Sequence, residues 1–282
     1  MTTGCLIFAQ NTVGVDYVKL ALFAAKRVKE HLNIPVSLAT DSQAWLEFYP
    51  EHTEIFDKII PIVGNTTQQK RFYDGSIAYK LAEWKNLTRN QAYDITPYDR
   101  TLVIDSDYII NSNTLEKALK NDYSFQIFRK SFDLAGWRDD SSFKRINQYS
   151  VPFYWGTVFI FEKTASTRSL FDLIEYIKLN WEYFRIIYKI DSPTFRNDFA
   201  FSIAIHIMNG STDGDFAQEL PGLMTYVLDR DILVKASNNK MQFLVEKAHY
   251  PGEYTLVSTN ATDVHVMNKQ SLTRYIDGDY GV

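Results

Sequence analysis

The chain has 282 residues and a formal net charge of −4, and 45% of its residues are hydrophobic and 15% aromatic. These values fit a globular protein with a substantial core and exclude an intrinsically disordered chain. The weakly acidic balance gives no reason to expect nucleic acid or an anionic membrane as the main partner.

Three further features predict where the protein works. The single cysteine, Cys5, excludes an intramolecular disulfide and favours a reducing compartment. No apolar run approaches the length of a membrane-spanning helix, and the start of the chain lacks the basic residues of a signal peptide. We therefore expect a cytoplasmic protein with no membrane span and no nucleic-acid partner.

Strand and helix patterns alternate through the first hundred residues. Short apolar runs bounded by polar residues indicate strands, and apolar residues at helical spacing indicate helices. In chain order these patterns predict a strand at 5–9, a helix at 16–31, strands at 36–39 and 58–62, a helix at 76–91 and a strand at 101–104. This alternation predicts an α/β fold with a mostly parallel sheet and right-handed crossovers.

The second half of the chain is less regular. Residues 124–150 mix aromatic residues with charges of both signs, and we expect a long excursion over the sheet edge. A β-forming run follows at 153–161, helical patterns cover 170–189 and 197–209, and two short strands are expected to end at 263–266. No internal repeat or linker interrupts the chain, so residues 1–282 are expected to form one domain.

An acid pair, Asp105-Ser106-Asp107, follows directly on the apolar strand at 101–104. In open α/β sheets, ligands bind at the carboxyl ends of the strands. Two carboxylates at such an edge repel each other unless a cation or a shared proton lies between them. The pair therefore predicts a divalent-cation site. The alternative is a loop with two solvated acids, because Asp-x-Asp often arises by chance.

Five short segments, in this order along the chain, resemble a known group of enzymes: LIFAQNT, SLATD, AYKLAEW, TLVIDSDYII and DVHVMNK. They resemble the nucleotide-sugar glycosyltransferases of the GT-A fold, nearest the glycogenin-like and lipopolysaccharide galactosyltransferase-like enzymes. Two motifs differ from the family. His265 to Lys269 lacks the family's Gly and its Pro-Trp, and Asn197-Asp198 stands where an Asp-Gln pair is common. The resemblance is therefore distant.

This resemblance implies a GT-A fold, with a nucleotide-binding half over residues 1–110 and an acceptor-side half over residues 111–282. It also implies a metal-dependent hexosyltransferase that uses a nucleotide-diphosphate-sugar, with uridine diphosphate as the family's commonest donor nucleotide. The acceptor would be a saccharide or another hydroxyl compound. Two aspartates and one histidine suit Mn²⁺ better than Ca²⁺, whose sites are all-oxygen, and Mg²⁺ remains possible.

The metal ligands that we expect are Asp105, Asp107 and His265. Asp105 has a second possible role as a ribose contact, with Ser106 beside it. Lys269 is the candidate partner of the donor diphosphate. The alternatives are structural: His265 could be satisfied by strand backbone, and Lys269 could be an exposed lysine that extends to solvent.

The nucleotide is expected at Gln10, Asn11 and Asp41, near the ends of the first two strands, with Lys80 at its phosphates or ribose. Their structural alternatives are turn formation for the first three and a solvated helix lysine for Lys80. Asp198 is the candidate catalytic carboxylate, and helix capping is its alternative.

Two other positions are weaker candidates. Gly156 and Thr157 would leave room for the donor sugar, and His206 lies on an apolar helix face, which favours a core position over a ligand role.

Two other functions fit parts of this pattern. A phosphatase-like hydrolase also places Asp-x-Asp after an apolar strand, although usually on the first strand and with Thr or Val two positions after the second Asp, where this chain has Ile109. A non-catalytic nucleotide-sugar-binding protein would keep the fold without turnover.

Overall fold

The computed structural model describes residues 1–43, 46, 53–63, 68–74, 78–85, 88–138, 143–147, 151–237 and 239–279, and only the backbone of 68–74, 78–84 and 279. Its central feature is a seven-stranded sheet with the strand order β11-β8-β10-β6-β1-β2-β3. The strands are β1 (Thr3–Ala9), β2 (Val36–Thr40), β3 (Lys58–Pro61), β6 (Arg100–Asp105), β8 (Phe125–Phe128), β10 (Trp155–Glu162) and β11 (Gln218–Glu219).

Most neighbouring strands of this sheet run parallel, which confirms the predicted α/β class. β1 is parallel to both β2 and β6, β2 is parallel to β3, and β11 is parallel to β8. β10 is the exception, because it runs antiparallel to β6 and β8. As a result, the start of β10 lies at the same sheet edge as the ends of β6 and β8.

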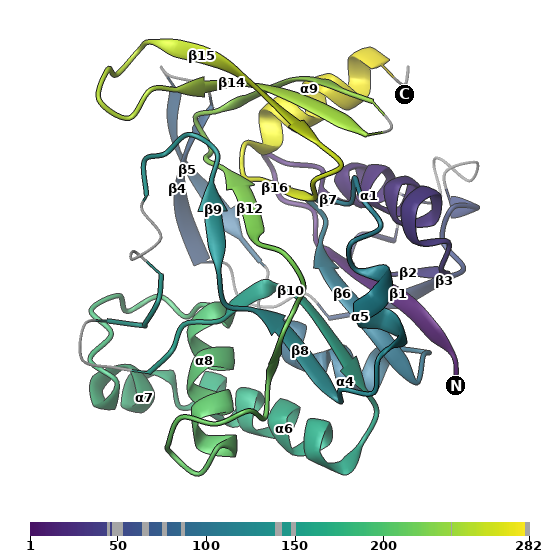
Figure 1. The fold of residues 1–282 in the computed structure, drawn as a ribbon, viewed down its shortest axis with the longest axis vertical. Coiled ribbons are helices and arrows are strands. Elements are labelled where there is room, and N and C mark those ends of the chain that lie inside the picture. The colour runs from purple at the N-terminus through teal and green to yellow at the C-terminus, as the bar shows by residue number, and fades with distance from the viewer. Residues whose placement is uncertain are drawn as a thin grey trace.

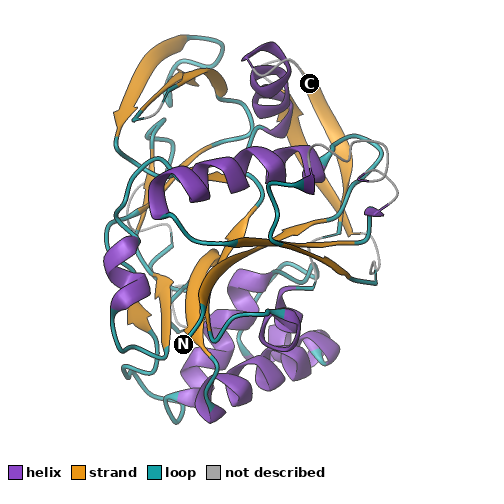
Figure 2. Cartoon of the chain, turned by 90° about the vertical axis from the view of Figure 1, so that its right-hand side faces the viewer, coloured by secondary structure: helices purple, strands orange, loops and turns teal. Residues whose placement is uncertain are grey.

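Helices cover both faces of the sheet, as Figure 2 shows. On one face lies α1 (Tyr17–Leu32), which begins at Asp16, whose side chain accepts a hydrogen bond from the Lys19 amide at 3.0 Å. The other face is covered by α6 (Ala165–Leu179) and α8 (Asn197–Met208). Other helical segments are η1 (Arg89–Gln91), α4 (Ala92–Ile95), α5 (Glu116–Lys120), α7 (Trp181–Ile187) and α9 (Lys269–Asp279).

Two further sheets are built largely from the second half of the chain (Figure 1). One has the order β7-β16-β12-β9, from β7 (Tyr108–Ile109), β16 (Val264–Val266), β12 (Met224–Val227) and β9 (Ser131–Asp133). The other joins β13 (Ile232–Ala236), β14 (Lys240–Glu246) and β15 (Tyr254–Asn260). β7 follows directly on Asp107, and its Tyr108 pairs with His265 of β16. This short pairing joins the end of the chain to the end of β6.

The predicted helix at 76–91 is wrong over Ala78–Trp84, and only the short 3₁₀ helix η1 (Arg89–Gln91) forms at its end. Ala78–Trp84 is a strand, β5, which pairs antiparallel with β4 (Gln68–Asp74) and places Lys80 opposite Phe72. The local preference of Ala, Leu, Lys and Glu for helix is weak, and pairing with an adjacent strand overrides it. Residues 75–77, 86 and 87 lie outside the described residues.

Three other expectations need correction in detail. The helical stretch at 170–189 is two helices, α6 and α7, separated at Asn180, whose backbone is not helical. The excursion at 124–150 contains β8 and β9. The segment before 266 holds six strands, β11 to β16, in place of the two expected, because β13 to β15 form a sheet of their own.

Among the described residues, none of the helices combines the length and the apolar character that a membrane span requires.

Gly4 in β1 is expected to be essential for packing. A Cβ atom at this position would lie 2.4–2.5 Å from three ring atoms of Tyr98, whose hydroxyl is fixed 2.7 Å from Ser37 Oγ. Gly4→Ala should therefore lower the free energy of unfolding by about 1–3 kcal/mol through overpacking. Gly14→Ala is the matched control, because nothing lies within 4 Å of its added Cβ. Denaturant unfolding measures both variants, and equal stability of the two would contradict this packing.

Candidate active site

Asp105, Asp107 and His265 converge at the carboxyl edge of the central sheet. One ligand atom from each lies within 4.8 Å of the others. His265 Nε2 is 3.3 Å from Asp107 Oδ2 and 3.9 Å from Asp105 Oδ2. Backbone pairing produces this arrangement, since Tyr108 pairs with His265 and the Val266 amide donates to the Asp107 carbonyl at 2.9 Å. Residues 158 positions apart are thus held together by one short strand pair.

Each of the two carboxylates also has a cationic protein partner. Lys269, the first residue of α9, places its Nζ 2.6 Å from Asp107 Oδ2. Arg89, in η1, forms an ion pair with Asp105 Oδ1 and donates a hydrogen bond to the Gly156 carbonyl. The Arg89 side chain is only 2% exposed and that of Asp107 only 5%. These charges are therefore shielded little by water and depend strongly on one another.

The ionisation of these groups follows from their mutual contacts. Burial acts to raise the pKa of Asp107, but the charges of Lys269 and His265 outweigh burial and hold that pKa below its ordinary value. Burial acts to lower the pKa of Lys269, and Asp107 reverses this effect, so the pKa is raised. Burial lowers the pKa of Arg89 to about 10, against the opposing effect of Asp198 and Asp107. Asp107 is therefore charged at neutral pH, and so are Lys269 and Arg89.

The donor atoms at this edge fit a divalent cation. Two carboxylates and an imidazole provide oxygen and nitrogen ligands, a set that suits Mn²⁺ and also admits Mg²⁺. Asp105 keeps Oδ2 toward His265 while Oδ1 pairs with Arg89. Lys269 lies against Asp107 Oδ2, so a cation that used this oxygen would require the ammonium to move.

The predicted nucleotide residues lie at the ends of β1 and β2. Gln10 Nε2 donates to Asp41 Oδ2 at 3.4 Å, and Thr88 Oγ1 donates to Gln10 Oε1 at 3.4 Å. Thr88 precedes Arg89, so these contacts join Gln10 and Asp41 to the acid pair. Asn11 Oδ1 accepts from the Val18 amide at 3.0 Å, which joins the loop after β1 to the first turn of α1. The side chain of Lys80 lies outside the described part of the structure.

Asp198 is the second residue of α8, close to the start as predicted. Its Oδ1 accepts from the Gly156 amide at 2.8 Å, and its Oδ2 pairs with Arg196 at 2.6 Å. Arg196 holds the capping position of α8, so the capping alternative for Asp198 is wrong. Since the Gly156 carbonyl accepts from Arg89, the backbone of Gly156 links Asp198 to the acid pair.

Gly156 itself serves the packing of α8 on β10. An added Cβ would lie 3.2 Å from the Phe201 ring and 3.4 Å from Asn197. The missing side chain thus lets α8 approach the strand, which replaces the expectation that Gly156 leaves room for a sugar. Ser106 is buried between the two acids. His206 lies at the other end of α8, outside this cluster and partly exposed.

Sequence reasoning missed Arg89. The residue follows no motif, and of the helix predicted at 76–91 only the short 3₁₀ helix that contains Arg89 forms. The one available signal for Arg89 is electrostatic. Two neighbouring carboxylates at a partly buried edge need positive partners, and Lys269 supplies only one positive charge.

No protein-family model matches this chain, and no curated protein matches it. Solved structures match it in part. The glycosyltransferase GlyE of Streptococcus pneumoniae TIGR4 is 13% identical, with a TM-score of 0.42, over 78% of this chain and 46% of its own. The galactosyltransferase LgtC, solved with donor and acceptor sugar analogs, is 13% identical, with a TM-score of 0.47. The match covers 77% of this chain and 72% of LgtC. The mannosyltransferase PcManGT from Pyrobaculum calidifontis, in complex with GDP-Man and Mn²⁺, is 11% identical, with a TM-score of 0.40. The match covers 77% of this chain and 56% of PcManGT.

The chain spans less than half of GlyE. At these identities and TM-scores the matches do not decide the function, which depends on the site.

Lys269→Met tests the charge balance around Asp107. Removing the ammonium leaves a buried carboxylate with less compensation, so the free energy of unfolding in EDTA should fall by about 3–5 kcal/mol. Mn²⁺ should restore part of this loss, because a cation at the acids replaces the missing charge. Lys130→Met is the control, since its lysine is 70% exposed and pairs with Glu219 at the surface, where a pair contributes about 0–1 kcal/mol. Equal losses in the two variants would contradict a special role of Lys269.

Proposed function

We propose that the chain is a metal-dependent glycosyltransferase that moves a sugar from a nucleotide-diphosphate donor, with a UDP-sugar as the first choice, to a saccharide or another hydroxyl acceptor. The observation that carries this proposal is the convergence of Asp105, Asp107 and His265, with Lys269 beside them, at the carboxyl edge of the sheet. Open α/β sheets bind their ligands at that edge.

Breaking the anomeric bond of the donor leaves negative charge on the departing diphosphate. A cation held by Asp105, Asp107 and His265 would act there as a Lewis acid. Lys269 would move its ammonium from Asp107 to a diphosphate oxygen, since Asp107 is then neutralised by the cation. A fixed positive charge aimed at the leaving group stabilises the charge that develops in the transition state.

The nucleotide would extend from the acids along the ends of β6, β1 and β2. Gln10 and Asp41, which contact each other there, would bind the base and ribose together with Asn11. Asp105 and Ser106 would contact the ribose, and Lys80 the phosphates.

Asp198 is the proposed catalytic carboxylate. The sugar centre becomes oxocarbenium-like during transfer, so a nearby carboxylate helps as a base or as an electrostatic partner. Both oxygens of Asp198 already have partners, Gly156 and Arg196. To accept a proton, Asp198 would give up the contact with Arg196, whose side chain is 41% exposed and packs over the Phe199 ring.

The phosphatase alternative is disfavoured by the surroundings of Asp105. To attack a phosphate as a nucleophile, Asp105 would have to give up its ion pair with the buried Arg89. A non-catalytic binder would keep the same site. Release of sugar from the donor without acceptor separates the three functions, because a binder releases nothing and a phosphatase prefers simple phosphate esters.

Asp107→Asn tests the metal and donor site. In the wild type, UDP with Mn²⁺ at about one hundred times its dissociation constant should add about 2.7 kcal/mol to the free energy of unfolding. The variant should lose this Mn²⁺-dependent stabilisation because the amide is a poor cation ligand. Thermal unfolding with UDP, GDP and ADP, with and without Mn²⁺, measures the effect.

Asp172→Asn, on the exposed side of α6, is the control for this experiment and should respond like the wild type. If none of the three diphosphates stabilises the wild type in a Mn²⁺-dependent way, the proposed function is wrong.

Asp198→Asn tests the catalytic role. The variant keeps an oxygen for the Gly156 amide but loses the charge, so turnover should fall by about 10²–10⁴ while donor binding is unchanged. Arg196→Gln is the matched control, because it removes the same ion pair and leaves the carboxylate in place. It should keep most of the turnover. Near-normal turnover of Asp198→Asn would assign this residue a structural role.

A further inference from the structure

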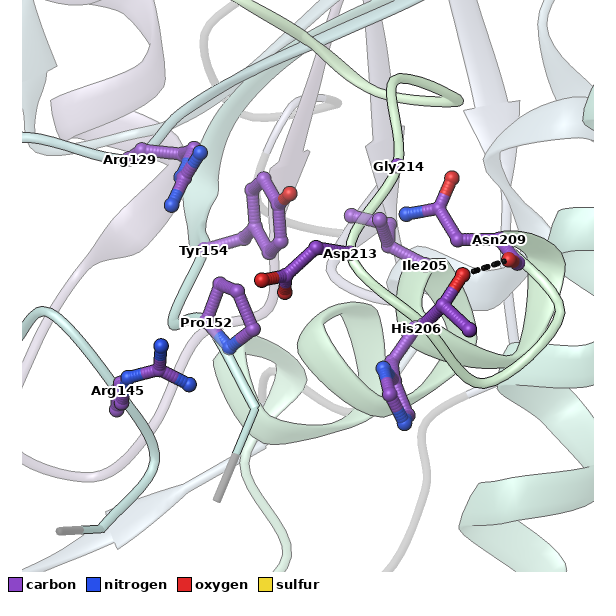
Figure 3. A pocket seen from close by; sticks show the side chains of 10 residues that line it. Arg129, Arg145, Pro152, Tyr154, Ile205, His206, Asn209, Asp213 and Gly214 are labelled. Atoms are coloured by element: carbon purple, nitrogen blue, oxygen red, sulfur yellow. Dashed lines mark hydrogen bonds between the residues drawn. The ribbon is translucent and has the colours of Figure 1, made fainter. Parts of the chain in front are cut away.

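A second hollow of about 170 Å³ lies apart from the acid–histidine site. The loop after β8, the loop before β10, the end of α8 and the turn that follows α8 surround it (Figure 3). Its polar lining consists mainly of Arg129, Arg145, Tyr154, His206, Asn209 and Asp213. Nothing in the proposed donor chemistry uses these side chains.

The hollow lies along the same sheet edge as the candidate active site. Phe128 of β8 pairs with Trp155 of β10, so Arg129 and Tyr154 lie just beyond the paired ends of these strands. β10 also pairs with β6, the strand that ends in Asp105. The hollow is therefore displaced from the acids by two strands toward the β11 side of the sheet.

Helix α8 connects the two places. Its second residue, Asp198, contacts Gly156 beside the acids, and its last turns contribute Ile205 and His206 to the hollow. Eight residues separate Asp198 from His206, which corresponds to about 12 Å along the helix axis. A ligand that reached from one to the other would run alongside α8.

The charges in the hollow favour an anion. The Arg129 guanidinium stacks over the Tyr154 ring, 5.6 Å from its centre, and forms no ion pair with any described residue. Arg145 brings a second guanidinium, and Asp213 is the one carboxylate among the described lining residues. Guanidinium groups bind carboxylates and phosphates through paired hydrogen bonds. Figure 3 shows both arginines on one side of the hollow and the α8 residues on the other.

The rest of the lining fits a sugar ring. Pro152, Tyr154 and Ile205 offer apolar surface, and hydroxyl groups would find polar partners in Thr212 and Asn209. Asn209 Oδ1 accepts from the Phe216 amide at 3.0 Å, which directs its amide nitrogen to other partners as a donor. His206 Nδ1 is buried and has no hydrogen-bond partner among the described residues. The volume is small beside the roughly 300–1,000 Å³ of pockets for larger ligands, so one sugar unit is the expected occupant.

We propose that this hollow binds an acidic sugar unit, one that carries a carboxylate or a phosphate, as part of the acceptor saccharide. The assignment to the acceptor rests on the proposed glycosyltransferase function. The binding of the acidic sugar rests on the hollow alone.

The test uses ligand-observed NMR titrations of the full chain with four probes: methyl glucuronoside, glucose 6-phosphate, methyl glucoside and inorganic phosphate. At least one of the two acidic sugars should bind about tenfold or more tightly than methyl glucoside, the effect of a charge-assisted hydrogen bond. The acidic sugar that binds more tightly shows whether the hollow prefers a carboxylate or a phosphate. Equal binding of the neutral glucoside, no binding of either acidic sugar, or inorganic phosphate binding as well as the sugars would overturn the proposal.

Two variants locate the binding. Arg129→Gln and Arg145→Gln should each weaken binding of the acidic sugar by about tenfold or more, since each removes a charge-assisted hydrogen bond. Lys130→Gln, which removes the neighbouring charge outside the hollow, should leave it unchanged. If the control weakens binding as much as the arginine variants, the hollow is not the site.

Thermal unfolding with UDP and Mn²⁺ is measured on the same variants and should stay as in the wild type. If the acidic sugar binds but no nucleotide diphosphate does, the glycosyltransferase proposal fails while the acidic-sugar site stands. If the nucleotide binds and the acidic sugar does not, the acidic-sugar site fails while the glycosyltransferase proposal stands.

Discussion

The repulsion between two carboxylates at a partly dry sheet edge is the constraint around which the other parts of the site are arranged. Asp105 and Asp107 are fixed by the end of β6 and the start of β7, so they cannot separate. Their repulsion is offset by side chains from distant segments that contact the carboxylates. These are Arg89 from η1, Lys269 from α9 and His265 from β16. Local electrostatics therefore explains why segments from both halves of the chain must meet at this edge.

The antiparallel strand β10 extends this network to the other face of the sheet. Because it runs against β6, its first residues lie beside Asp105. The carbonyl of Gly156 can accept from Arg89, and its amide can donate to Asp198. The backbone of one residue thus links the charge on α8 to the charge on the acid pair. Close packing of α8 on Gly156 keeps this coupling short.

The sequence predicts the parts of the fold that depend on local patterns. Apolar runs located β1, β2, β3 and β6, and helical spacing located α1, because burial on one face imposes a period that can be read directly. The acid pair can be read from the sequence because two carboxylates follow directly on an apolar strand, where they repel each other unless a cation or a shared proton lies between them. The strand at Ala78–Trp84 and the role of Arg89 could not be read, because both depend on partners far away in the sequence. His265 was found only through its family resemblance, since a lone histidine in a strand has no local signature.

Helix α8 has one more consequence, for selection among acceptors by length. A helix has a fixed rise per residue and cannot stretch, so the separation between Asp198 and the hollow at its far end is built into the chain. The helix therefore sets a fixed distance between the two places. On the proposed function, an acceptor whose acidic unit lies one sugar too near or too far would fill the hollow but present no hydroxyl to the donor. The enzyme would then discriminate between saccharides of the same composition by the position of their charge.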